Sequence, residues 1–209
     1  PYATRLQDLV YFEGIIRKVK THSIAEYFCF SKPKYVPISK LSCDAQEGKA
    51  IVCDELIWKN IQQNRAIKYL SIMLPNGGAN VHLGIMYLDT EDTELVLAHE
   101  LGHFLGIIDE YTLPAHHKAC SSTTEKALSN NIVLLEPTLS INELNANQLR
   151  EKLNNLLPWG GSIKSKTPIF RKMEGKWVIG TPEKYHDEIG LFPTSTCAKS
   201  LFQTYKPVM

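Results

Sequence analysis

The sequence predicts an α+β fold with a mixed sheet, and three observations support this prediction. Residues 6–19 place apolar side chains at helical spacing. Residues 67–74 and 81–88 are short runs rich in β-branched and aromatic residues, which is typical of strands, and a second helical pattern begins near Leu95. A chain of 209 residues is long enough to bury a sizeable core as one domain of two lobes.

The upper α/β lobe is predicted to cover residues 1–106. After the first helix, the sequence DAQEGKAIV between Cys43 and Cys53 predicts a hairpin with a glycine at its turn. A helix over residues 54–65 is expected to begin at an aspartate N-cap. The turn sequence PNGG then separates the two predicted strands, and the second strand leads directly into the helix that begins near Leu95.

The lower lobe, residues 107–209, is predicted to be rich in loops. After Tyr111 the sequence is loop-like until residues 142–157, where helical spacing returns. A short hairpin is expected around residues 173–176, which carry a central glycine. Residues 190–209 are too apolar and aromatic for a solvated linker, so we expect an ordered loop there.

Charge and composition exclude several classes of protein. The 23 basic and 22 acidic residues give a formal net charge of +1, so no global charge favours nucleic acid or an anionic membrane. The chain has no apolar run long enough to span a membrane. It begins Pro1-Tyr2-Ala3 without an apolar signal core, which we interpret as a mature or trimmed chain. We expect a monomer.

The five cysteines indicate disulfides in an oxidising compartment. None lies in a C-x-x-C pair, which argues against a thioredoxin-type site. Cys43 and Cys53 could pair across the predicted hairpin, and Cys120 and Cys197 lie in polar loop sequence, where a disulfide explains them best. Cys29, in the apolar run AEYFCF, is then expected to be a buried free thiol. We therefore expect a secreted or periplasmic protein.

The run AHELGHFLGIIDEY, residues 98–111, contains the candidate metal-binding and catalytic residues. Residues four apart share one face of a helix, so His99 and His103 can bind one metal ion through their imidazoles. Glu100 lies one step around the helix, where it can take a proton from a water and later give it to a leaving amine. Zn²⁺ is the expected metal, since zinc prefers nitrogen and carboxylate ligands of this kind.

A third ligand is predicted after the helix. Gly106 can take the left-handed conformation that ends a helix, so the chain can turn back and bring Asp109 to the metal. Glu110 is the competing ligand, since spacing alone does not exclude it. The alternative to a metal site is an amphipathic helix that carries two histidines by chance. A helical context, a preceding strand, a helix-ending glycine and a downstream acid together favour the metal site.

The residues His99, Glu100, His103, Gly106 and Asp109 resemble the pattern H-E-x-x-H-x-x-G-x-x-H/D of the metzincin zinc endopeptidases. Their run is similar to that of snapalysin-type secreted proteases. Together with the stretches GLF and YKP near the chain end, the trailing Asp-Glu-Tyr resembles the immunoglobulin-A-cleaving metallopeptidases. The resemblance implies a metzincin-like fold with an active-site helix and a methionine turn beneath the zinc. Met209 is the best candidate for that turn, and Met173, in a charged hairpin, is a poor one.

The function predicted first is a zinc-dependent endopeptidase in one catalytic domain over residues 1–209, with Glu100 as the general base. In such peptidases the substrate lies antiparallel to an edge strand before the metal helix. We expect residues 81–88 to be that strand, with Gly84 allowing close backbone approach. The alternatives are a zinc amidohydrolase acting on cell-wall or terminal peptide bonds, and a non-catalytic zinc-binding module. The presence of Glu100 argues against the module, because a structural metal site needs no general base.

Overall fold

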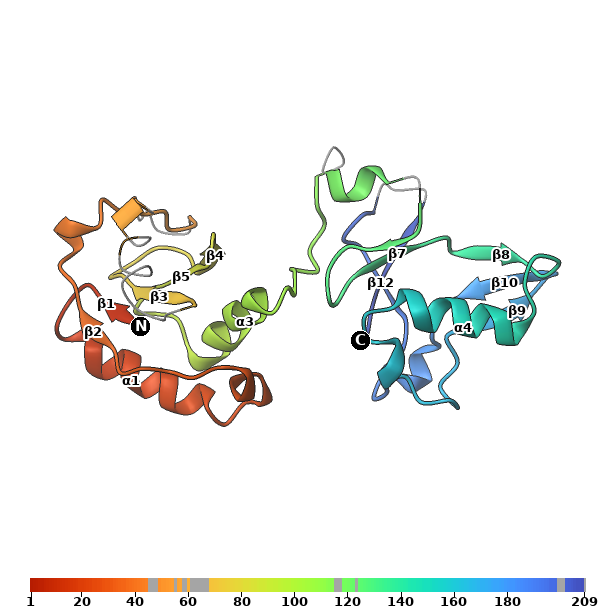
Figure 1. Ribbon diagram of the computed structural model, residues 1–209, viewed down its shortest axis with the longest axis horizontal. Helices are drawn as coiled ribbons and strands as arrows, with labels where there is room; N and C mark the ends of the chain where they lie inside the picture. Colours follow the sequence, from red (N-terminus) through yellow and green to blue (C-terminus); the bar gives the residue numbers. More distant parts are fainter. Residues whose placement is uncertain are drawn as a thin grey trace. The chain divides into compact units, whose positions relative to one another are not determined.

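The chain is a mixed α and β protein of two compact units, Pro1–Leu105 and Gly106–Met209, in the computed structural model (Figure 1). Each unit has its own sheets and its own core. The residues that the structure describes are 1–44, 49–54, 56–57, 60, 68–114, 118–122, 124–198 and 202–208. Among them, no helix is long and apolar enough to cross a membrane.

The first unit is built on a five-stranded sheet, which confirms the predicted mixed sheet. Four strands are parallel neighbours and the fifth, at the edge, runs antiparallel. In spatial order they are β2 (Lys34–Tyr35), β1 (Tyr2–Ala3), β3 (Leu70–Met73), β5 (Ile85–Leu88) and β4 (Asn80–His82).

The single strand predicted over residues 81–88 is wrong, because the chain reverses in its middle. Leu83 and Gly84 connect β4 to β5 with φ angles of 47° and 83°. A two-residue hairpin turn of this kind requires positive φ at both positions. Gly84 therefore serves the turn, and a Cβ added there would meet no atom of the described chain within 4 Å. A non-glycine residue with positive φ such as Leu83 gives no sequence signal for the turn.

Two helices cover one face of this sheet, α1 (Asp8–Val19) and α3 (Glu94–Phe104) (Figure 1). Side chains alternate along the strands, so Met73 faces the helices while Ile72 faces the opposite core. Helix α1 confirms the helix predicted from residue 6, although it begins two residues later and leaves Leu6 exposed.

The opposite face of the sheet is covered by the segment that holds the first disulfide. Asp44 and Val52 form an antiparallel bridge, and Cys43 and Cys53 are disulfide-bonded beside it, which confirms the predicted hairpin. Leu41 and Ile51 of this segment are fully buried against the sheet. Its glycine turn and most of the helix predicted over residues 54–65 lie outside the described residues.

The second unit carries two described sheets and a helix, joined by loops. The strands that the structure describes there are antiparallel and form two sheets around helix α4 (Ala146–Leu156). One sheet has the order β8 (Thr138–Ser140), β10 (Lys176–Ile179) and β9 (Phe170–Met173), and the other has the order β11 (Phe192–Thr194), β12 (Gln203–Lys206), β7 (Val133–Leu135) and β6 (Lys126–Ala127). The described 3₁₀ helices are Ser23–Tyr27 and Ile38–Lys40 in the first unit, and Lys118–Ser121, Gly160–Ser162 and Glu183–Tyr185 in the second.

The ordered loop predicted over residues 190–209 is wrong, because β11 and β12 lie within it. Strand β12 pairs with β7, about seventy residues earlier in the chain, so the neighbouring sequence does not predict this strand. Pro193 argues against a strand in sequence, but β11 is the edge strand of its sheet, where a missing N–H donor is tolerated. The hairpin predicted around Met173 is confirmed by β9 and β10, which Glu174 and Gly175 connect with positive φ angles.

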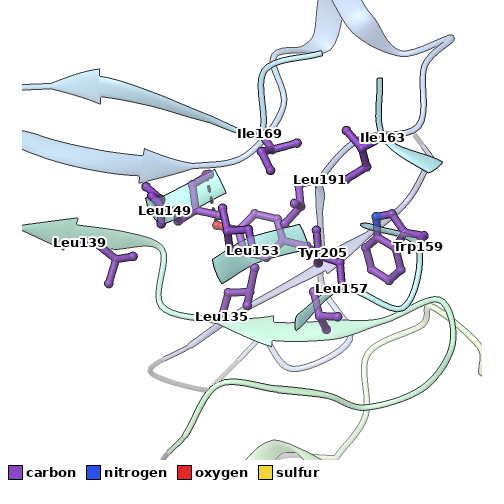
Figure 2. Close-up of a cluster of buried hydrophobic side chains, with 12 residues drawn as sticks. Leu135, Leu139, Leu149, Leu153, Leu157, Trp159, Ile163, Ile169, Leu191 and Tyr205 are labelled. Atoms are coloured by element: carbon purple, nitrogen blue, oxygen red, sulfur yellow. Dashed lines mark hydrogen bonds between the residues drawn. The ribbon is translucent and has the colours of Figure 1, made fainter. Parts of the chain in front are cut away.

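Helix α4 organises the core of the second unit, as Figure 2 shows. Asn145 caps the helix in a reciprocal capping box with Gln148, which explains why it begins four residues after the predicted start at residue 142. Leu149 and Leu153 are fully buried among side chains of both sheets. The Tyr205 hydroxyl donates to the Ile179 carbonyl at 3.3 Å, and burial raises the Tyr205 pKa to about 12. The cluster further includes Leu135, Leu139, Leu157, Trp159, Ile163, Ile169 and Leu191.

The second predicted disulfide, Cys120–Cys197, is also present, and two disulfides fit an oxidising environment. The prediction for Cys29 is half right: it is the free thiol, but it is exposed and not buried. Its neighbours Phe28 and Phe30 are the partly buried residues of that apolar run, packed against the first unit's core.

Removing the second disulfide is expected to destabilise the protein more than removing the first. The Cys120–Cys197 bond spans 77 residues and the Cys43–Cys53 bond spans 10. Loop-closure entropy then predicts that the free energy of unfolding falls by about 4 kcal/mol when Cys120 and Cys197 are replaced by serine. The same replacement of Cys43 and Cys53 should lower it by about 3 kcal/mol. Denaturant unfolding of the two double variants measures this difference, with Cys29→Ser as the control. Equal stability of the Cys120–Cys197 variant and the wild type would contradict the expectation.

Candidate metal centre

Helix α3 carries the predicted metal residues and begins at a well-formed cap. Thr93 has extended backbone angles, and its hydroxyl accepts from the Leu95 N–H at 3.3 Å. The acidic residue Glu94 follows in the first turn, where the helix dipole favours negative charge. On the chain before the cap, Asp89 and Asp92 accept hydrogen bonds from backbone N–H groups of the same turn. The start of the helix is therefore fixed by side chain to backbone bonds.

The helix brings three of the predicted residues together. The rings of His99 and His103 have centroids 4.9 Å apart and are nearly perpendicular. The Glu100 carboxylate lies 3.9 Å from Nε2 of His103. One potential ligand atom from each of the three residues lies within 4.8 Å of the others. The group is asymmetric in burial, since His99 is exposed, His103 half-buried and Glu100 only 5% exposed.

This donor set fits a metal ion. Two imidazole nitrogens and a carboxylate are the ligand types that zinc accepts, and residues four apart on a helix present both rings to one ion. His99, Glu100 and His103 therefore form a group that could hold a metal ion. The exposed side of His99 leaves the group accessible from solvent.

Helix α3 ends as predicted from its glycine. Leu105 is the C-cap, and its N–H bonds the carbonyls of Gly102 and His103. Gly106 follows with a φ of +80°, the left-handed conformation that ends helices. A Cβ at Gly106 would lie 3.1 Å from Nδ2 of Asn130, so the position is also crowded.

The segment after Gly106, which belongs to the second unit, is held by its own set of hydrogen bonds. Asn130 N–H donates to the Gly106 carbonyl at 3.2 Å. The Asn131 side chain bonds both backbone groups of Ile108, accepting from the N–H at 3.0 Å and donating to the carbonyl at 2.9 Å. Because Ile108 immediately precedes Asp109, this clamp fixes the backbone that leads to the predicted third ligand.

Glu110 is held in a different way from Asp109. Its carboxylate is 2.5 Å from the Lys206 ammonium, and its carbonyl accepts from the hydroxyls of Thr194 and Thr196 at 3.3 and 3.2 Å. Glu110 is thus tied to the segment around β11 and β12. Asp109 is half-buried, and its charge and hydrogen bonding, together with burial, raise the pKa of Tyr111. Asp109 belongs to the second unit, so its role as third ligand stays a prediction.

No family model, curated protein or solved structure matches this chain. The resemblance to metzincins is thus carried by the residues of the H-E-x-x-H-x-x-G-x-x-D pattern alone. Of the two candidates for a methionine turn, Met209 lies outside the described residues. Met173 ends β9 and is exposed, with the Arg171 Nε 3.1 Å from its sulfur.

Tyr69, which the sequence does not single out, contacts the end of helix α3. Its hydroxyl donates to the Phe104 carbonyl at 3.2 Å, and its ring stacks on the Phe104 ring at 4.2 Å between centroids. These contacts hold the last turn of α3 immediately after His103. No sequence signal links Tyr69 to this turn, because 35 residues separate it from Phe104.

We expect Tyr69→Phe to weaken metal binding several-fold, because it removes the hydrogen bond and keeps the stacked ring. The loss of stability should be about 1 kcal/mol, the net value of one such bond. Metal titration of the purified variant measures the effect. Tyr11→Phe is the matched control, since the Tyr11 hydroxyl bonds the Asp92 carbonyl before the other end of α3. An equal loss of metal affinity in both variants would argue against a specific role for Tyr69.

Proposed function

We propose that the chain is a zinc-dependent endopeptidase, with His99, His103 and Asp109 as metal ligands and Glu100 as general base. The observation that carries this proposal is the buried Glu100 carboxylate beside the two histidines. A carboxylate costs free energy to bury and needs compensating interactions, so its position next to a metal-binding pair is best explained by a role in the chemistry.

Each of the proposed site residues has its own role in binding the metal or in the reaction. His99 and His103 would hold the ion from α3, and Asp109 would hold it from the clamped segment after Gly106. When bound, zinc supplies Lewis acidity, polarising a carbonyl and lowering the pKa of a water to about 7. Glu100 takes a proton from the attacking water and gives it to the leaving amine nitrogen as the peptide bond breaks. Tyr69 keeps the end of α3, and hence His103, in place.

A substrate peptide would lie along β4, one of the two outer strands among the described strands of the first unit's sheet. Strand β4 pairs antiparallel with β5, and an extended chain would add to its other side by backbone hydrogen bonds. The β4–β5 hairpin is also the element that directly precedes α3 in the chain. The three residues of β4 would thus bind the substrate in place of the longer strand predicted over residues 81–88.

Incubation with an unfolded protein substrate, with and without a chelator, tests the proposed function. We expect internal peptide bonds to be cut, the chelator to stop cleavage, and added zinc to restore it. Mass spectrometry of the products separates the alternatives. Release of terminal residues only would point to the amidohydrolase alternative, and no product at any zinc concentration would point to a non-catalytic module. Cleavage that persists in the chelator would contradict the metal mechanism.

A further inference from the structure

The first unit contains an apolar cavity behind the metal helix, on the opposite side of α3 from the histidines. Its volume is about 460 Å³, within the range of small-molecule binding sites. Successive residues of a helix are rotated by about 100°, so Leu97, Leu101 and Phe104 line the cavity while His99 and His103 face away from it. The cavity is therefore separate from the candidate metal centre.

Most of the described residues that line the cavity are apolar or aromatic, and the charged side chains among them are lysines. Lys34 and Lys68 line it, and the Lys68 ammonium lies 5.0 Å from the centre of the Tyr69 ring. No acidic side chain is among the described residues that line the cavity. Apolar residues from α1, the sheet and the segment after the first 3₁₀ helix complete the wall, among them Phe12, Ile16, Phe28 and Met86.

A shallower basic groove adjoins the cavity and shares three of its lining residues. The groove has a volume of about 160 Å³. It adds three cations and one acid to the same surface. The shared residues are Ile16, Phe30 and Ser31, and the groove adds Arg17, Lys20, Lys32 and Glu13. The surroundings of the apolar cavity therefore carry an excess of positive charge.

We propose that this cavity binds a medium-chain fatty acid, with its alkyl chain among the apolar side chains and its carboxylate beside Lys34 and Lys68. Burial of the alkyl chain supplies the hydrophobic part of the affinity. The lysines stabilise the carboxylate, and none of the described residues that line the cavity is acidic. The proposal does not rest on the proposed function, since no metal residue lines the cavity.

Cys29 gives a direct probe of the occupant. It lines the cavity, and it is the free thiol left by the two disulfides. Decanoate should slow the reaction of Cys29 with a maleimide dye in a saturable way, because the bound acid shields the thiol. The combined Lys34→Glu and Lys68→Glu variant should need about ten times more decanoate for half-maximal protection of Cys29. The reason is that loss of the contacts between the lysines and the carboxylate weakens binding by about that factor. Lys172→Glu, on exposed β9 of the second unit, is the matched control and should behave as the wild type.

Two further probes identify the source of the ligand. Decanol has the same chain without the charge and should protect Cys29 much less than decanoate does. Vesicles of phosphatidylglycerol offer anionic head groups on a membrane surface and should give no protection. The proposal is overturned if decanoate does not slow the labelling of Cys29, if decanol protects equally well, or if the vesicles protect and free decanoate does not.

Discussion

Replacing Glu100 by alanine should leave the fold and the metal content intact and remove nearly all peptide cleavage. The buried carboxylate lies 3.9 Å from Nε2 of His103, so it is placed to exchange a proton at the metal site. General acid–base catalysis contributes roughly 10²–10⁴-fold to the rate, and the expected loss in kcat is of that size. Steady-state cleavage of a quenched-fluorescence peptide by zinc-loaded protein measures it.

Glu94→Gln is the matched control for Glu100→Ala. Glu94 is also a carboxylate of α3, but it lies in the first turn and pairs with Lys18 at 3.5 Å. Its replacement should leave kcat unchanged. Thermal unfolding and zinc analysis of both variants show whether any loss comes from misfolding or metal loss. A Glu100→Ala variant that is folded, holds zinc and cleaves at the wild-type rate would refute the proposed general base.

Replacing Asp109 by alanine should raise the zinc dissociation constant more than any other single change outside α3. Loss of a residue that only orients a ligand costs about 10–100-fold in metal affinity, and loss of a ligand should exceed that range. The clamp of Asn131 on Ile108 holds the backbone next to Asp109, so the segment should keep its conformation in the variant. Zinc titration with a competing chelator measures the change.

Glu110→Gln is the comparison that decides between the two acids. Its carboxylate already pairs with Lys206, and its carbonyl accepts from Thr194 and Thr196, so we expect this variant to keep its zinc affinity. Loss of the partly exposed ion pair should lower stability by no more than about 1 kcal/mol. The opposite ranking, with zinc affinity lost in Glu110→Gln and kept in Asp109→Ala, would make Glu110 the ligand.

The local features of the candidate site could be predicted from the sequence. The spacing of His99 and His103, the acid between them and the glycine after Leu105 are all contained in one short run, and helix geometry converts that spacing into a shared face. The φ of Gly106 and the position of Cys43 opposite Cys53 also follow from neighbouring residues. These predictions succeeded because the interactions that determine them are local.

Most of the features that could not be predicted depend on contacts between residues far apart in the sequence. Strand β12 pairs with the distant β7 and β11 pairs in turn with β12, and the clamp on Ile108 comes from Asn131. Tyr69 reaches the end of α3 across the whole β3–β5 segment. The turn at Leu83 and Gly84 is local, but leucine rarely adopts a positive φ, so the sequence does not predict a turn there. Cys29 lies in an apolar run whose phenylalanines are partly buried while its thiol is exposed.

The zinc content of the purified protein tests the central claim most directly. Elemental analysis of the wild type, expressed with zinc and dialysed against metal-free buffer, should find about one zinc per chain. The combined His99→Ala and His103→Ala variant, which removes both imidazoles from α3, should retain none while keeping the disulfide-linked fold. Wild-type protein that contains no zinc and gains neither metal nor peptidase activity when zinc is added would contradict the account.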